Sequence, residues 1–154
     1  MPRLRVAGLR ALYRVAFRLL QLRMVLLPGR GRGVKCLLTC GDEVLLVRHT
    51  YGPRRTWQLP GGAAVRGEDA VRAAAREMEE ELGLRELRWR ELTTIDMRLE
   101  YMPVHVTCVH AALEDPTVSP DPVEIAQAQW FALDDLPRPL GAEVEPLLDV
   151  LFDS

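Results

Sequence analysis

The chain has 154 residues, of which 48% are apolar and 27% charged, and its formal net charge is -2. These values are ordinary for one globular domain with its own core. The small net charge hides an asymmetry, because residues 1–33 contain eight arginines and no acid, whereas residues 34–154 are acidic. The acidic body argues against nucleic-acid binding by bare charge and favours a site that attracts metal cations.

The basic segment has the pattern of an amphipathic helix. Between about Leu4 and Leu27, arginines repeat along one helical arc and aliphatic residues along the opposite arc, and Pro28-Gly29 ends the pattern. Three interpretations stay open: a helix packed on the body or on a partner subunit in a homodimer, a helix on a membrane surface, or a targeting peptide. The second would make residues 1–27 a peripheral membrane contact.

Cysteine usage and hydropathy bear on the compartment. Cys36, Cys40 and Cys108 lack metal-ligand spacing, and the first two lie in an apolar run typical of buried cysteine. Such a set favours a reducing, cytoplasmic compartment. The sequence has no apolar run near the ~18 residues that span a bilayer, and arginines interrupt the segment where a secretory signal would be continuous.

Residues 34–154 predict strands and helices in mixed order, and hence an α/β (α+β) sandwich of a sheet and helices. The expected strands span residues 34–40, 43–49, 57–59, 87–100, 103–113 and 128–132. The expected helices span residues 68–82 and 145–152. Gly41-Asp42 is placed as a hairpin turn, residues 51–56 as a loop, and Gly83 as a glycine stop.

The helix over residues 68–82 has its acidic residues in a pattern. Glu77, Glu80 and Glu81 stand at i, i+3 and i+4 and so share one face, where like charges repel. A divalent cation removes that repulsion, and carboxylate oxygens are ligands that Mg²⁺ or Mn²⁺ prefers. Glu79 and Arg72 are expected to face solvent. A separate apolar stripe is predicted to seat the helix on the sheet: Val71, Ala74, Ala75, Met78 and Leu82. For an isolated acidic run, a solvated face is the alternative.

The spacing around this helix resembles the Nudix box, Gly-x5-Glu-x7-Arg-Glu-U-x-Glu-Glu-x-Gly-U, where U is a bulky aliphatic residue. Every spacer has the right length, and the matching residues are Gly62, Glu68, Arg76, Glu77, Met78, Glu80, Glu81, Gly83 and Leu84. Further similarity extends over about residues 34–136 and leaves out the basic head. The resemblance implies a Nudix-type α/β/α sandwich with a mixed β-sheet over residues 34–154, and residues 1–33 would be an additional helix and connector.

The resemblance also implies roles for individual residues. Glu77, Glu80 and Glu81 would hold the metal, one of them serving also as the base, and Gly61 would offer its backbone carbonyl. Arg76 would orient the glutamates, while Glu68, Gly62 and Gly83 would support the loop and the helix. Glu124 sits where several family members place a further metal-binding or basic glutamate.

The implied activity is Mg²⁺-dependent hydrolysis of a diphosphate bond in a nucleoside diphosphate derivative. Arg48, Arg54 and Arg55 flank the expected mouth and would clamp phosphate, and Tyr51 would stack on a base; a solvated loop is the alternative. Tyr101 loosely resembles the tyrosine of diadenosine-polyphosphate hydrolases, and the lack of asparagine disfavours a MutT-like base pocket. His49, His105 and His110 have no ligand spacing and are expected to be structural or exposed.

Two other functions compete with this hydrolase. One is a catalytically silent Nudix-fold binding or regulatory module, against which the intact box argues. The other is an isomerase acting on an isoprenyl diphosphate, whose added cysteine and glutamate have no counterpart in this sequence.

Overall fold

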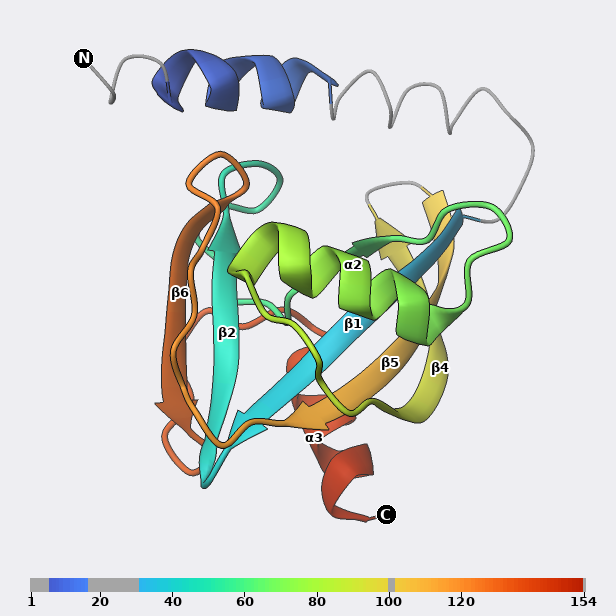
Figure 1. The fold of residues 1–154 in the computed structure, drawn as a ribbon. Helices are drawn as coiled ribbons and strands as arrows, with labels where there is room; N and C mark the ends of the chain where they lie inside the picture. The colour runs from blue at the N-terminus through green and yellow to red at the C-terminus, as the bar shows by residue number, and fades with distance from the viewer. Residues whose placement is uncertain (1–5, 17–30, 100–101, 154) are drawn as a thin grey trace.

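The computed structural model describes residues 6–16, 31–99 and 102–153. A mixed sheet lies between two helices, with a further helix across one end (Figure 1). The strands are β1 (Gly31–Cys40), β2 (Glu43–His49), β3 (Gly61–Ala63), β4 (Arg90–Leu99), β5 (Met102–Ala112) and β6 (Ile125–Ala132). The helices over the sheet are α2 (Ala70–Leu82) and α3 (Val144–Phe152). The predicted sandwich is thus confirmed.

The strand order is β4-β5-β1-β2-β6, with β3 paired to β1. β1 and β5 are parallel, and the other pairs are antiparallel, so the sheet is mixed. β1 pairs with β2 only beside their turn, at Thr39 and Cys40. Beyond that point the two strands diverge (Figure 1), and β3 pairs with the opening half of β1. α2 crosses the sheet over these two diverging strands (Figure 1).

The core has one layer on each side of the sheet because side chains alternate along the strands. One layer contains Cys36, Leu45 and Val47 with α2. The other contains Leu37, Val44 and Leu46 with α3. Central strands buried on both sides show as continuous apolar runs in the sequence, which made β1 and β2 easy to predict.

The predicted elements agree with the structure except for their ends and one strand. The strand expected over residues 57–59 is wrong, because this segment forms only isolated bridges, from Gln58 to Val47 and from Trp57 to Leu140. The prediction missed β3, which is short and rich in glycine, and β6 begins at Ile125 rather than Ala128. Residues 100–101, including Tyr101, lie outside the described residues. Cys36 and Cys108 are buried, whereas Cys40 is partly exposed.

Residues 6–16 form the described part of the N-terminal helix. It lies across the end of the sheet where β2 meets the loop before β3 (Figure 1). Leu9, Leu12 and Val15 are exposed, at 50%, 64% and 56%. The rest of the predicted helix between Leu4 and Leu27 lies outside the described residues. Within the described segments, no helix is long and apolar enough to cross a bilayer.

Candidate active site

α2 begins and ends with local signals that its sequence supplies. Asp69 caps the first turn, since its Oδ1 accepts from the Arg72 amide at 2.8 Å. Gly83 closes the helix in the left-handed conformation with φ +68°, and its amide donates to Glu79 O at 3.1 Å. The predicted glycine stop is confirmed, and the helix starts at Ala70, two residues later than predicted.

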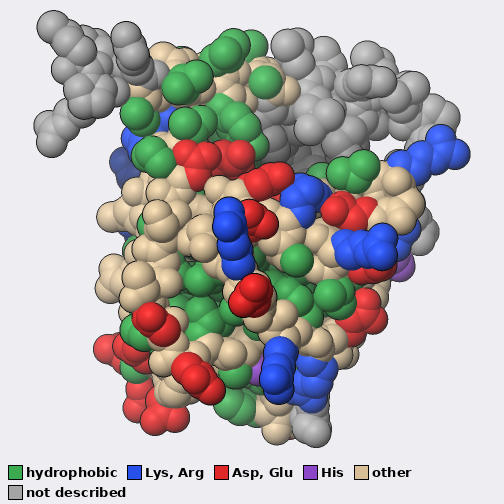
Figure 2. Space-filling model, viewed as in Figure 1, with side chains coloured by type: hydrophobic (Ala, Val, Ile, Leu, Met, Phe, Trp, Pro, Cys, Tyr) green, Lys and Arg blue, Asp and Glu red, His purple; other side chains and the backbone are tan. Residues whose placement is uncertain are grey.

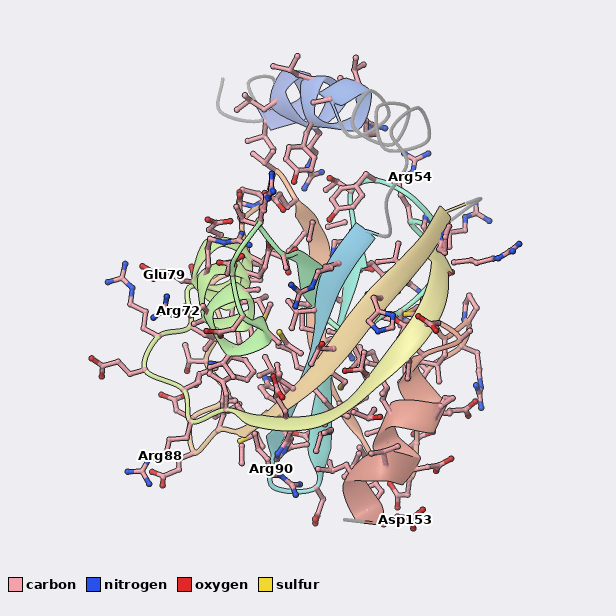
Figure 3. The ribbon with its side chains drawn as sticks, turned by 90° about the vertical axis from the view of Figure 1, so that its right-hand side faces the viewer. Arg54, Arg72, Glu79, Arg88, Arg90 and Asp153 are labelled. Atoms are coloured by element: carbon pink, nitrogen blue, oxygen red, sulfur yellow. The ribbon has the colours of Figure 1, made fainter. Side chains whose placement is uncertain are left out.

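The buried face of α2 contains carboxylates as well as apolar side chains. Ala74, Met78 and Leu82 face the core as predicted, whereas Val71 and Ala75 are exposed. The prediction for Val71 and Ala75 is therefore wrong, because the buried stripe is rotated toward the glutamates: Ala73, Ala74, Glu77, Met78, Glu81 and Leu82. Arg72 and Glu79 point away from the sheet, as expected (Figure 3).

Arg76 connects the loop before α2 to the glutamates. Its Nε and Nη2 donate to the two oxygens of Glu68, each at 3.0 Å, and its Nη1 donates to Glu77 Oε1 at 2.7 Å. Nη1 also lies 3.5 Å from Glu80 Oε2. Glu68 additionally accepts from the Val65 amide at 2.9 Å, and the Arg76 hydrogen bonds lower its pKa to about 2. The planar guanidinium of Arg76 therefore orients the carboxylates of Glu68 and Glu77.

Gly61 and Gly62 let the loop pass under these carboxylates. A Cβ at Gly62 would lie 2.5 Å from the Glu77 carboxyl carbon, and one at Gly61, whose φ is +149°, would lie 2.1 Å from Val34 O. Contacts this close to a backbone oxygen are not tolerated. The two glycines therefore place the backbone directly against Glu77 and β1.

Glu81 is the most deeply buried carboxylate of the site, with 1% of its side chain exposed. Among the described residues, neither of its oxygens has a hydrogen bond of normal geometry, although the Gly61 backbone lies close enough to oppose the rise in its pKa. His49 Nε2, likewise without a hydrogen bond there, lies 3.6 Å from Oε1. Burial raises the pKa of Glu81 to about 8 and lowers that of His49 to about 4. Burial also raises the pKa of Glu77. Glu80 points outward, with 55% of its side chain exposed.

Glu124 reaches the site on the loop before β6. The loop is fixed to α2 by the Ser119 and Asp121 amides, which donate to Leu82 O and Glu81 O, each at 2.8 Å. On the other side, the Thr50 amide donates to Glu124 O at 2.9 Å. Burial and the nearby Glu81 raise the pKa of Glu124 to about 7. The loop thus brings a further carboxylate beside Glu81.

The predicted phosphate-binding residues fall in two places. Arg48 lies on the α3 side, where its guanidinium is 4.3 Å from the Trp57 ring centroid and its Nη1 donates to Gln127 Oε1 at 3.0 Å. The expectation that Arg48 lies at the mouth is therefore wrong, because alternation along β2 turns His49 to the α2 side and Arg48 away. Arg54 and Arg55 lie on the exposed loop after β2, at the sheet end nearest the N-terminal helix (Figure 3).

Acidic side chains gather between the N-terminal helix and α2 (Figure 2).

The family model described as the NUDIX domain matches residues 29–151. The chain belongs to the Nudix family. An ADP-ribose pyrophosphatase of Mycobacterium tuberculosis is 50% identical over 50 residues, which are 32% of this chain and 24% of that protein. The NAD-capped RNA hydrolase NudC of Pseudomonas entomophila is 33% identical over 118 residues, covering 75% of this chain and 42% of that protein.

A solved structure supports the same assignment. The MutT NUDIX hydrolase from Burkholderia pseudomallei superposes with a TM-score of 0.74 at 27% identity, covering 80% of this chain and 99% of that one. The chain spans less than half the length of each of these two curated relatives.

The site fits a divalent cation by the chemistry of its donors. Glu81 has two buried oxygens without a partner, and an uncompensated buried carboxylate is costly unless a cation neutralises it. Among the described residues, no three acidic, histidine or cysteine side chains gather closely enough to hold a cation by themselves. Phosphate oxygens and waters would therefore supply the remaining ligands, as is usual for Mg²⁺.

The sequence reasoning missed two residues at this site. His49, expected to be structural or exposed, is 5% exposed, and it adjoins Glu81, a contact that the sequence did not indicate. The alternation of β2 carried the signal, because His49 follows Val47 on the face that packs against the box helix. Tyr13 was also missed, because it comes from the N-terminal helix, for which the Nudix box gives no register.

Proposed function

We propose that this Nudix chain hydrolyses a diphosphate bond in a nucleoside diphosphate derivative, with Mg²⁺ as its cofactor and Mn²⁺ as a substitute. The observation that carries the proposal is the buried Glu81, whose oxygens have no hydrogen bond of normal geometry among the described residues, with Glu77 on the same face of α2 and Glu124 near enough on its loop for the two carboxylates to interact. Both curated relatives are named for nucleotide derivatives, an ADP-ribose and a NAD-capped RNA. These names support the substrate class.

The carboxylates and Gly61 would have separate roles in the reaction. Glu77, Glu80 and Glu81 would hold the cation, with the carbonyl of Gly61 as a further oxygen. When bound, the cation neutralises phosphate charge and acidifies a water. Glu124 would take a proton from the attacking water, since a carboxyl with a pKa of about 7 is a base matched to neutral pH.

Substrate contacts outside the box would come from the end of the sheet near Tyr51. Arg54 and Arg55 are exposed there and form no ion pair within the described residues, so their guanidinium groups are available to a phosphate. Tyr51 lies between His49 and Tyr13 in the same region. A nucleotide bound over Glu81 would therefore contact arginine and tyrosine side chains outside the box.

The test is phosphate release from a panel of nucleoside diphosphate derivatives with Mg²⁺, comparing the wild type with Glu80→Gln. We expect kcat/KM to fall by about 100-fold or more, because a charged oxygen ligand is lost. Glu79→Gln is the matched control: Glu79 is the neighbouring residue, pairs with Arg85 at 2.7 Å, and should retain activity within about twofold.

Two results would contradict the proposal. Equal turnover by wild type and Glu80→Gln would remove Glu80 from the metal site. Metal-dependent nucleotide binding without turnover by the wild type would instead favour the silent Nudix-fold module.

A further inference from the structure

The N-terminal helix contacts the loop that carries Glu124, although residues 6–16 precede the matched Nudix residues 29–151. Arg10 Nε donates to Pro122 O at 2.6 Å across 112 residues of sequence. Tyr13 also interacts with Glu124, because burial and this neighbouring carboxylate raise the pKa of the Tyr13 hydroxyl. Both contacts come from the side of the helix that faces the site, while Leu12 points to solvent.

Among the described residues, the Nudix body fixes the backbone of this loop, and the N-terminal helix interacts with the Glu124 side chain. Thr50 binds the loop twice, through its amide to Glu124 O at 2.9 Å and through its hydroxyl to Val123 O at 2.6 Å. These bonds set where the residue lies. The direction of its carboxylate depends on side-chain partners, and Tyr13 provides one from outside the body.

The ring of Tyr13 is itself held in place. Its centroid lies 5.4 Å from that of Tyr51, and Tyr51 lies 4.9 Å from His49, which adjoins Glu81. Tilted aromatic pairs at such separations contribute about 0.5–1.5 kcal/mol beyond their buried area. A continuous row of rings therefore connects the N-terminal helix to the deepest carboxylate of the site.

We propose that Tyr13 is a positioning residue for Glu124, and that the N-terminal helix is a wall of the active site of this Nudix chain. The hydroxyl donates to the carboxylate and restricts it to rotamers beside Glu81, while the contact with Tyr51 and the Arg10 bond keep the hydroxyl there. This inference rests on the proposed function in one respect, the participation of Glu124 in the reaction.

The kinetic test uses ADP-ribose and Mg²⁺ as the probe with the full chain. Tyr13→Phe retains the ring and removes the hydroxyl, so we expect kcat to fall about tenfold with KM changed less than twofold. In a Glu124→Gln background the same substitution should have no further effect, because the partner has already lost its charge. Leu12→Ala, one residue away on the exposed face, is the control and should match the wild type.

A second measurement is independent of turnover. Hydrogen exchange of the peptide covering residues 118–126 should be faster in the Arg10→Ala/Tyr13→Ala double variant than in Leu12→Ala, since the helix then no longer rests on the loop. Equal exchange in the two variants would overturn the proposed wall. Wild-type kcat in Tyr13→Phe, when Glu124→Gln is impaired, would overturn the positioning role.

The two measurements also separate this inference from the proposed function. If Glu124→Gln and Tyr13→Phe both keep wild-type kcat, Glu124 has no part in the reaction and the positioning role of Tyr13 fails with it. If the wild type cleaves no substrate of the panel, the proposed function fails, and the exchange result alone decides for or against the helix as a wall.

Discussion

Two helices border the carboxylates, and they present opposite kinds of surface to the protein. α2 turns Met78 and Leu82 into the core together with the carboxyl groups of Glu77 and Glu81. The N-terminal helix turns Arg10 and Tyr13 inward and leaves its aliphatic residues in solvent: Leu9, Leu12 and Val15 (Figure 2).

The two helices are therefore held in place by different interactions. Apolar burial holds α2, at roughly 25 cal/mol per Å² removed from water, and this offsets the cost of placing Glu81 where it lacks a partner. The N-terminal helix contributes little buried apolar surface through its described residues, so a few hydrogen bonds and one ring contact hold it. We therefore expect substitutions in α2 to change stability and those in the N-terminal helix to change function.

The largest expected effect concerns stability. Met78→Ala removes a fully buried side chain from the layer between α2 and the sheet and should lower the free energy of unfolding by about 2–4 kcal/mol. Leu12→Ala should change it by less than about 0.5 kcal/mol, because Leu12 is 64% exposed. Urea unfolding followed by circular dichroism measures both. A comparable loss in Leu12→Ala would mean that the outer face of the N-terminal helix is covered.

A smaller effect on the free energy of unfolding follows from the Glu81 carboxyl, which is buried on α2. In the metal-free protein Glu81 has a pKa of about 8, above the ordinary 4.5, so its carboxyl is held protonated while the unfolded chain ionises. This costs stability as the pH rises above 4.5, and the cost stops growing near pH 8. Glu81→Gln removes it, and the variant should be more stable at pH 8 by about 1–2 kcal/mol, or about 2–6 °C in Tm.

The pH dependence of this difference is the sharper measurement. The advantage of Glu81→Gln should shrink toward zero between pH 8 and pH 4.5. The buried His49, whose pKa is about 4, destabilises both proteins below pH 6.5 and largely cancels in the comparison. With Mg²⁺ present, the wild type should gain stability and the variant should not. A pH-independent difference would argue against a buried, protonated Glu81.

The two helices also differ in how far sequence could predict them. Fixed spacing predicted α2 and its glycine stop, since each depends on contacts within about fifteen residues, but the ion pair between Glu68 and Arg76 was found only in the structure. Alternation along β2 indicates which face His49 lies on, but not its contact with Glu81, because that contact depends on how β2 diverges from β1. Val71 and Ala75 were misplaced for a related reason: periodicity finds an apolar stripe, but a site that buries carboxylates rotates the helix away from it.

The N-terminal helix shows the same limit of prediction from sequence. Its amphipathic pattern predicted a helix and left open what each face meets. In the structure the basic arc supplies Arg10 to the loop before β6, a contact that depends on tertiary geometry. Nothing in the spacing of residues 6–16 marks Tyr13 as different from any other helical tyrosine.

The smallest expected effect concerns the outer face of that helix, for which membrane contact stays a prediction. Residues 1–33 contain eight arginines and no acid, so the exposed aliphatic residues lie in a segment suited to an anionic bilayer. Replacing Leu9, Leu12 and Val15 together by Ser should lower co-sedimentation with phosphatidylserine vesicles by about 1 kcal/mol of binding free energy. The fold should keep its Tm, since these side chains are already in water.

A matched control separates this surface from general stickiness. Val65 and Phe152 are exposed to similar extents, at 60% and 64%, but lie outside the basic segment. Replacing both by Ser should leave vesicle binding unchanged. Equal loss in the two sets would refute a specific membrane face. If the triple variant lost a dimer in sedimentation equilibrium, a second copy of the chain would cover Leu9, Leu12 and Val15. Both helices at the site would then bury their apolar sides.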